Sequence, residues 1–367
     1  MKFRKILAVL LAALMLVSVC GAAASAATVN SNGMIITEEW QGLIDRFEGG
    51  KGPETNGYQL DYKYYSPVEK KSDKTKYPLV IFLHGMGEGK YDGDQIFENP
   101  IAYWASDEFQ ARFSGTKGAY VLCPRSLEEK GLFWDYVLVE PLRATIDDFI
   151  AQNKKNIDTT RIYIGGFSMG GKMTLKMCVA YTDMFAAAFP ICPAWIPFPD
   201  DSVFENLADL PIWMTSSKND PAVNYYLVAS HFWNLIKENA NDKTKVRFST
   251  LDRAVFPDGK SAINGHFSWL AVEHDMFSEE NGDYPGMKTV DGNGDAVTLS
   301  YPNGMISWLS QFKSGYDGTP IEGTGNLDIT EQQESPLFSL DTIIQVLKEL
   351  MVFIQQLYDA LQPFINM

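Results

Sequence analysis

The sequence of 367 residues has few cysteines and few histidines, four of each. So few cysteines exclude a disulfide-framed scaffold, and no CxxC or CxxH pair suggests a metal site. Cys123, Cys178 and Cys192 lie in apolar contexts where buried free thiols are expected, with one bridge among them as the alternative. The sequence therefore predicts no cofactor and no metal, and it leaves only four candidates for a catalytic histidine.

Positive charge is also scarce, since 31 basic residues face 46 acidic ones and give a net charge of −15. An excess of negative charge of this size argues against nucleic acids or anionic lipid surfaces as partners. Long apolar runs are absent as well, and the one at Ile6–Val19 is too short for a comfortable membrane span. The length allows one large domain with appendages.

The first 27 residues have the three parts of a secretory leader. Basic residues open the chain, the apolar run Ile6–Val19 follows, and Ala24–Ala26 offers an A-x-A cleavage site. We therefore expect a signal peptide at 1–27 and a secreted protein. Lipidation at Cys20 is the alternative, although Val19 is bulkier than the residue that normally precedes a lipidated cysteine.

The stretch Arg161–Ala180 predicts a strand, a sharp turn and a helix. Its centre, Gly166–Gly170, reads GFSMG, and glycines at both flanks let the backbone pass closely around Ser168. Such a pattern arises by chance in a glycine-containing chain, but here an apolar strand precedes it and an apolar periodic segment follows it. Ser168 is therefore the expected nucleophile, which needs a histidine base, an acid and oxyanion donors.

Apolar runs alternate with amphipathic segments along the chain. This alternation predicts a parallel α/β sheet whose chemistry gathers at the carboxyl ends of the strands. The expected strands cover residues 59–65, 79–83, 119–122, 161–164, 185–191, 211–214 and 246–251, and helices are expected at 38–47, from 139, after Ser168 and at 225–236.

A glycine-rich loop, 84–89, directly follows the buried strand at 79–83. The backbone N–H of Met86 in this loop and that of Met169 after the nucleophile are the expected oxyanion donors. A simple tight turn is the alternative interpretation of the loop.

The acid and the base should follow the serine in that order. Asp220 comes after the strand at 211–214, and a helix N-cap is its other, compatible role. His266 lies on a polar loop after the last strand and is the expected base, in preference to His274. His84 falls in the oxyanion loop and His231 on a helix, so neither fits the base.

Three segments resemble secreted α/β-hydrolase esterases. They are Tyr77–Gly85 (YPLVIFLHG), Asn156–Tyr163 (NIDTTRIY) and Gly166–Gly171 (GFSMGG), and the resemblance extends from Leu60 to Phe312. It is closest to the group of feruloyl and acetyl-xylan esterases, polyhydroxybutyrate depolymerase-like proteins and predicted prolyl-oligopeptidase-like peptidases.

The resemblance implies an α/β-hydrolase fold with a mostly parallel central sheet and helices on both faces. It also implies Ser168 as nucleophile, Asp220 as acid and His266 as base, with the amides of Met86 and Met169 as oxyanion hole. Two segments depart from the family and are placed to reshape the pocket, namely 193–199 (PAWIPFP) and an insertion at 281–303.

Trp134, Trp195 and Trp269 are candidates for an aromatic platform that binds a sugar ring or a phenolic group, with core packing as the alternative for each. Within the insertion, 291–295 (DGNGD) has part of a calcium-loop spacing, but it lacks the required glycine and glutamate. We therefore expect a hairpin turn there.

The catalytic domain is expected to span 28–315, followed by a flexible acidic linker at 316–336. Residues 337–367 carry an apolar stripe at helical spacing, which predicts an amphipathic C-terminal helix. Such a helix is expected to bury its apolar face. It can do so by docking on the catalytic domain, by self-association or by binding a surface partner.

Together these features predict a secreted serine esterase that works through an acyl-enzyme. On the strength of the resemblance, we expect carbohydrate esters of the feruloyl or acetyl type as substrates. A serine peptidase is the first alternative, because the same triad cleaves amides. A non-catalytic surface binding protein is the second.

Overall fold

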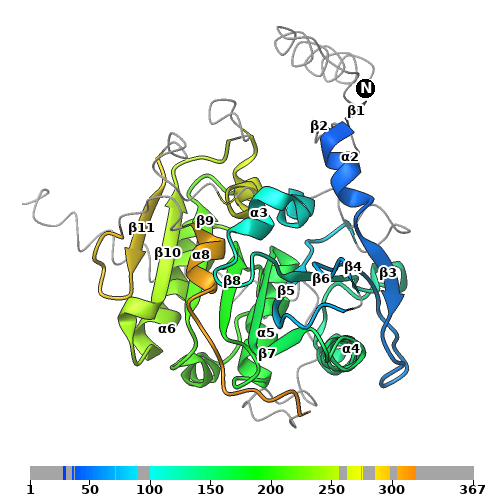
Figure 1. Ribbon diagram of the computed structural model, residues 1–367. Helices are drawn as coiled ribbons and strands as arrows, with labels where there is room; N and C mark the ends of the chain where they lie inside the picture. The colour runs from blue at the N-terminus through cyan, green and yellow to red at the C-terminus, as the bar shows by residue number, and fades with distance from the viewer. Residues whose placement is uncertain are drawn as a thin grey trace, which may run out of the picture.

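A mixed sheet of nine strands forms the centre of the molecule (Figure 1). The computed structural model describes residues 28–29, 35–36, 38–70, 72–88, 100–255, 263–273, 275, 286–297 and 304–319. The predicted signal peptide at 1–27, the helix at 337–367 and His274 lie outside the described residues. Among the helices described, none has the length and apolarity needed to cross a membrane.

The strand order in the sheet is β11-β10-β9-β8-β7-β5-β6-β4-β3. The six strands from β10 to β6 run parallel, and β11, β4 and β3 pair antiparallel at the two edges. The bounds are β3 Glu48–Lys51, β4 Asp61–Tyr65, β5 Tyr77–Leu83, β6 Tyr120–Pro124, β7 Ile157–Phe167, β8 Ala187–Ile191, β9 Ile212–Ser217, β10 Val246–Leu251 and β11 Lys288–Asp291; β1 (Thr28–Val29) and β2 (Ile35–Ile36) form a separate ribbon.

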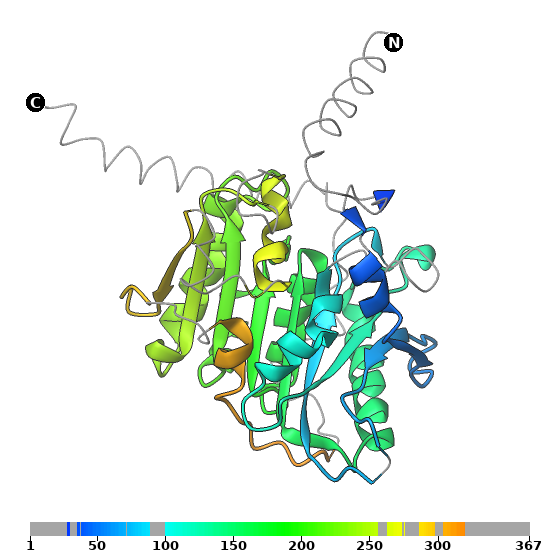
Figure 2. The same ribbon diagram turned by 45° about the horizontal axis from the view of Figure 1, so that its top comes forward.

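Helices cover both faces of the sheet, as Figure 2 shows with α3 and α8 in front of it and α4 behind. Helix α5 packs on β7 and β8 and contacts α4, whereas η3 contacts α3 and α7. The helices are α2 Glu38–Ile44, α3 Asp107–Ala111, α4 Val139–Gln152, α5 Met169–Ala180, α6 Ser230–Asn239, α7 Trp269–Glu273 and α8 Met305–Leu309; the short helical turns are η3 Pro100–Ala105, η4 Glu128–Lys130, η5 Tyr136–Leu138, η6 Asp201–Leu207, η7 Tyr225–Ala229, η8 Lys243–Lys245 and η9 Gly265–Ser268. The predicted α/β-hydrolase architecture is confirmed.

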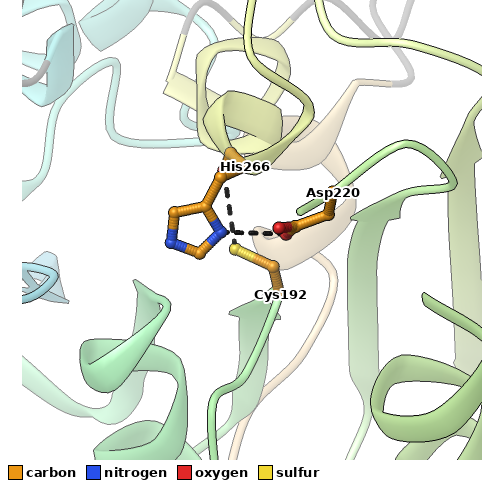
Figure 3. A group of neighbouring side chains, drawn as sticks. All are labelled: Cys192, Asp220 and His266. Atoms are coloured by element: carbon orange, nitrogen blue, oxygen red, sulfur yellow. Dashed lines mark hydrogen bonds and ion pairs between the residues drawn. The ribbon is translucent and has the colours of Figure 1, made fainter. Parts of the chain in front are cut away.

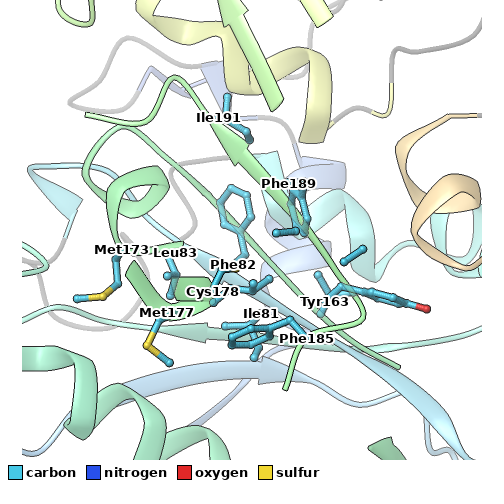
Figure 4. Close-up of a cluster of buried hydrophobic side chains, with 14 of the residues drawn as sticks. Ile81, Phe82, Leu83, Tyr163, Met173, Met177, Cys178, Phe185, Phe189 and Ile191 are labelled. Carbon is cyan, nitrogen blue, oxygen red and sulfur yellow. The ribbon is translucent and has the colours of Figure 1, made fainter. Parts of the chain in front are cut away.

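Strands β5, β6 and β8 are buried from end to end because apolar side chains leave them on both faces, and β7 is buried from Ile162 to Phe167. Figure 4 shows residues of β5, β7, β8 and α5 packed into one cluster. In this cluster the ring of Phe189 lies against the backbone of Gly165, where any Cβ would collide with it. The ring of Trp104 stacks on Phe189 at 5.5 Å between centroids. Gly165 therefore lets the strand that leads to Ser168 pack directly against an aromatic layer.

The elements at the edges were predicted less well than the central strands. Strand β3 was not predicted, because its residues Glu48–Lys51 (EGGK) have no apolar alternation and are held by pairing with β4. Residues 291–295 form the expected hairpin turn, in which Oδ1 of Asp291 accepts from the N–H groups of Asn293 and Asp295 at 2.8 and 3.0 Å. The insertion that contains it supplies β11 to the sheet.

Two further predictions can be compared with the packing. The three cysteines of the described domain, Cys123, Cys178 and Cys192, are buried free thiols, as expected. The linker was predicted to begin at residue 316, but Tyr316 is buried and its hydroxyl donates to Asp147 at 3.1 Å. The packed domain therefore extends at least to Tyr316, because this aromatic side chain anchors the chain against α4.

Candidate active site

Ser168 occupies a strained turn between β7 and α5. Its backbone has φ 56° and ψ −116°, a conformation that residues with a side chain rarely adopt. The turn is possible because Gly166 and Gly170 lack side chains. A Cβ at either glycine would collide with the carbonyl oxygen of Leu83 at the end of β5. The turn thus exposes the serine hydroxyl at the carboxyl ends of the parallel strands.

The structure brings Ser168, His266 and Asp220 together. The hydroxyl of Ser168 lies 3.1 Å from Nε2 of His266, and Nδ1 of His266 lies 2.9 Å from Oδ2 of Asp220. An ionised carboxylate can only accept, so Nδ1 carries the ring proton and Nε2 accepts from the serine. This is the geometry of a nucleophile, a base and an orienting acid.

Asp220 lies on the loop that follows β9, where it contacts the imidazole but caps no helix, since Asn224 is the N-cap of the following η7. Oδ1 accepts from the N–H groups of Ala222 and Val223, each at 2.8 Å, while Oδ2 faces the imidazole. These two backbone donors orient the carboxylate so that its second oxygen points at the imidazole.

His266 is delivered by η9, whose N-cap is Asn264. The side chain of Asn264 accepts from the N–H of His266 at 2.9 Å. Gly265 lies so close to Asn219 that any Cβ would collide with its backbone, so the glycine lets η9 approach the acid loop. The base and the acid are therefore held on two loops in direct contact.

The pKa of His266 is raised above its ordinary value of 6.5. Burial of the ring disfavours the cation, but the Asp220 carboxylate that accepts from Nδ1 favours it. An imidazole that is stabilised as a cation is a stronger base toward the serine proton.

The loop at 84–88 that follows β5 carries Met86. Met86 and Met169 both border the cavity at Ser168, and Met169 is the first residue of α5, whose N–H has no partner within the helix. The structure thus places both residues on the wall of the cavity at Ser168, and the role of their N–H groups as oxyanion donors stays a prediction.

A second set of contacts, which the sequence did not predict, fixes this loop. The N–H of Gly87 donates to both carboxylate oxygens of Glu128 at 2.9 Å, and Glu128 is buried on η4. Nε2 of His84 accepts from the N–H of Ser126 at 3.0 Å, while Nδ1 donates to the carbonyl of Gly85 at 2.6 Å. No motif in the sequence marks Glu128 as a partner of this loop.

His84 is therefore a structural residue, as its position in the chain suggested. Complete burial lowers its pKa to about 4, so the ring is neutral at ordinary pH. His231, also set aside as a base, packs with a tilted ring on Phe198, with 4.4 Å between ring centroids, and its Nε2 lies 3.5 Å from Oδ1 of Asp201.

A cavity of about 350 Å³ opens at Ser168. Its walls are mostly apolar, with Glu88, Ser168 and His266 as the polar members. The apolar lining residues are Met86, Phe167, Met169, Ala194, Ile196, Ala222, Val223, Phe267 and Trp269. Ala194 and Ile196 come from the segment that departs from the family, so this segment shapes the pocket as expected.

Of the three tryptophans expected to bind substrate, only Trp269 borders this cavity, where it stacks on Phe167 at 4.1 Å between centroids. The prediction is wrong for Trp134 and Trp195, which are 0% and 3% exposed. The indole N–H of Trp134 donates to the carbonyl of His84 at 2.9 Å. The ring of Trp195 packs against Phe232 instead. Both are core residues, because Trp134 is hydrogen-bonded to the loop of His84 and Trp195 is packed on α6.

Comparisons with known proteins agree with this site. A family model described as phospholipase/carboxylesterase matches residues 138–267, a range that includes Ser168, Asp220 and His266. A bifunctional acetylxylan esterase/xylanase of Neocallimastix patriciarum is 29% identical over 179 residues, which are 47% of this chain and 23% of that protein.

Among solved structures, a thermostable esterase has a TM-score of 0.53 at 26% identity and covers 74% of this chain and 64% of its own. An acylaminoacyl peptidase has a TM-score of 0.43 at 16% identity, covering 67% of this chain and 44% of its own, which is too distant to argue from. The chain thus spans less than two thirds of the length of these relatives. The predicted resemblance to α/β-hydrolase esterases is confirmed.

Proposed function

We propose that this chain, which has an α/β-hydrolase fold and resembles carboxylesterases, hydrolyses carboxylic esters through an acyl-enzyme at Ser168. The observation that carries this proposal is the continuous hydrogen-bond chain from Ser168 through His266 to Asp220, at 3.1 and 2.9 Å, beside an apolar cavity. A binding protein without catalysis has no need to keep this chain intact.

The proposed reaction has two halves. His266 accepts the serine proton on Nε2 while Oγ attacks the ester carbonyl, and the N–H groups of Met169 and Met86 hold the oxyanion. The imidazolium then donates the same proton to the leaving alkoxide. In the second half His266 deprotonates water, which attacks the acyl-enzyme and releases the acid. Asp220 stabilises the imidazolium in both halves.

The substrates we propose are carbohydrate esters of the feruloyl or acetyl type. Support comes from the acetylxylan esterase activity in the name of the Neocallimastix relative. Further support comes from the cavity, whose volume of about 350 Å³ is in the range of small-molecule sites. The apolar wall of the cavity, to which Met86, Met169 and Ile196 contribute, suits an acyl group.

Secretion is likewise a proposal, based on the basic, apolar and small-residue pattern of residues 1–27. Expression of the full chain in a secreting host, followed by N-terminal mass analysis of the exported protein, tests it. We expect a new N-terminus near residue 28. Retention of the whole leader inside the cell would contradict secretion.

The esterase proposal is tested with residues 28–367 and nitrophenyl esters of acetate and ferulate. Ser168→Ala and His266→Ala should each lower kcat by about 10⁴-fold or more. Ser202→Ala, at an exposed serine on η6, is the matched control and should keep full activity.

The matching amides separate the peptidase alternative from the esterase. Hydrolysis of nitroanilides at rates similar to the esters would favour a peptidase. An unmodified protein that is inactive on both, or ester hydrolysis that survives Ser168→Ala, would overturn the proposed function.

A further inference from the structure

A buried thiol lies next to the histidine and the aspartate of the site. Figure 3 shows Cys192 below His266, with a dashed line from its sulfur to His266 and with Asp220 beside both residues. One ligand atom of each residue, the Cys192 sulfur, a carboxylate oxygen and a ring nitrogen, lies within 4.8 Å of the other two. Among the residues that the structure describes, these three side chains are close enough together to share one metal ion.

Cys192 is held firmly in this position. It directly follows β8, is fully buried and has a φ of 34°, a value that non-glycine residues seldom adopt. Its N–H donates to the carbonyl of Thr215 on β9 at 2.8 Å, and its Sγ lies 3.8 Å from the carbonyl oxygen of His266. The parallel sheet thus presents the thiol toward the loops of the acid and the base.

Thiolate, imidazole and carboxylate together form a ligand set typical of Zn²⁺. In a tetrahedral zinc site the ligand atoms lie about 3.5 Å apart. Here Nδ1 of His266 and Oδ2 of Asp220 are 2.9 Å apart, and all three atoms lie within 4.8 Å. Small side-chain rotations are therefore enough to close the three ligands around one ion.

We propose that Cys192, Asp220 and His266 form a latent inhibitory site for a thiophilic divalent cation such as Zn²⁺ or Cd²⁺. The ion bonds to Sγ, Oδ2 and Nδ1. The thiol proton leaves to solvent, and the proton displaced from Nδ1 is replaced by one on Nε2, so the ring stays neutral. One proton is released in total for each ion bound.

Binding in this mode stops the proposed reaction without covering the serine. With its proton on Nε2, His266 can donate to the hydroxyl of Ser168 but can no longer accept from it, so no base remains. The Asp220 oxygen that should stabilise the imidazolium is bound to the metal instead. The site is thus empty in the active enzyme, and the metal is an inhibitor rather than a cofactor.

The route into the site predicts slow inhibition. The side chain of His266 is 18% exposed, whereas that of Asp220 is 0% exposed and Cys192 is fully buried. An ion must therefore pass the imidazole to reach the thiol, so loss of activity should develop after mixing rather than at once. A chelator should restore activity, because no covalent bond of the protein is changed.

The first experiment measures ester hydrolysis after incubation with Zn²⁺, Cd²⁺ or Mg²⁺. Zn²⁺ and Cd²⁺ should inhibit slowly and reversibly, whereas Mg²⁺, which prefers oxygen ligands, should not. Cys192→Ala should raise the half-inhibitory concentration of Cd²⁺ about 100-fold or more, relative to its own uninhibited activity. Cys178→Ala, at a buried thiol on α5 away from the site, should be inhibited like the unmodified protein.

A second experiment does not depend on catalysis. At a pH above the pKa of His266, calorimetry with Cd²⁺ and the Ser168→Ala protein should give one ion per chain, with one proton released when two buffers of different ionisation enthalpy are compared. The double variant Ser168→Ala, Cys192→Ala should lose this binding. Equal inhibition or equal binding with and without Cys192 would overturn the proposal, and so would the absence of Cd²⁺ binding. Failure of ester hydrolysis alone would instead concern the proposed function.

Discussion

The loop that carries His84 and the loop that carries His266 both border the cavity at Ser168, yet they hold their histidines in opposite states. Each imidazole is hydrogen-bonded at both nitrogens. His84 forms hydrogen bonds only with backbone groups and is fully buried, and burial lowers its pKa to about 4, with a further contribution from the positive charge of Arg125. His266 meets a carboxylate and a sulfur, and its pKa is raised. The charged partner, rather than the residue type, separates a structural histidine from a candidate base.

The substitution expected to have the largest effect is Asp220→Asn, which removes the charged partner of His266. The amide can donate to Nδ1 and so favours the wrong tautomer, in which Nε2 carries the proton and no longer accepts from Ser168. We expect kcat for ester hydrolysis to fall by about 10⁴-fold, with the fold intact by circular dichroism. A loss below tenfold would mean that Asp220 does not orient the base.

On the His84 side, the corresponding change is Glu128→Ala. It removes both oxygens that accept from the N–H of Gly87 and so releases the loop that carries Met86. Since the loss of one oxyanion donor costs about 10² to 10³ in kcat, a loosened donor should cost about 10- to 100-fold. KM should change little. A change in KM alone would show that Glu128 affects substrate binding and not the oxyanion hole.

The pH dependence of kcat/KM tests the difference in pKa between His266 and His84. His266 must be neutral to accept the serine proton, so activity falls as the pH falls through its pKa. Because the pKa of His266 is raised, kcat/KM should begin to fall at a pH above 6.5. Below the pKa of His266, kcat/KM should fall about tenfold for each pH unit. His84, with its pKa near 4, should add no limb above pH 5. A limb below pH 6 would contradict the assignment of His266 as a stabilised base.

The smallest effect is expected for Trp134→Phe. The substitution removes the N–H that donates to the carbonyl of His84 but keeps most of the buried ring. Unfolding free energy should fall by about 1 to 3 kcal/mol, since a buried carbonyl loses its partner, and activity should change only a few-fold. Denaturant unfolding with parallel rate measurements checks both. A loss of activity as large as that of Glu128→Ala would place Trp134 closer to the chemistry than its burial suggests.

The catalytic candidates could be predicted because their positions follow from local rules and chain order. The glycines around Ser168 mark the elbow, and Asp220 and His266 follow successive strands whose carboxyl ends meet. The central strands were predictable for a similar reason, since continuous apolar runs mark strands buried on both faces.

The remaining features depend on contacts between distant segments. Glu128 approaches Gly87 across 41 residues, and Cys192 lies 74 residues before His266 in the chain. Neither pairing has a motif. The burial of Trp134 and Trp195 was likewise not predictable, because an aromatic residue between two strands has the same appearance in a core as in a pocket. Strand β3 depends on its partner β4 rather than on its own residues.

The most direct test of the central claim is covalent labelling of the protein with a fluorophosphonate, which reacts with an activated serine, followed by peptide mapping. The account predicts one adduct, on Ser168, that is absent from Ser168→Ala and forms far more slowly in His266→Ala. An adduct on another serine, or an equal rate of labelling in His266→Ala, would contradict it.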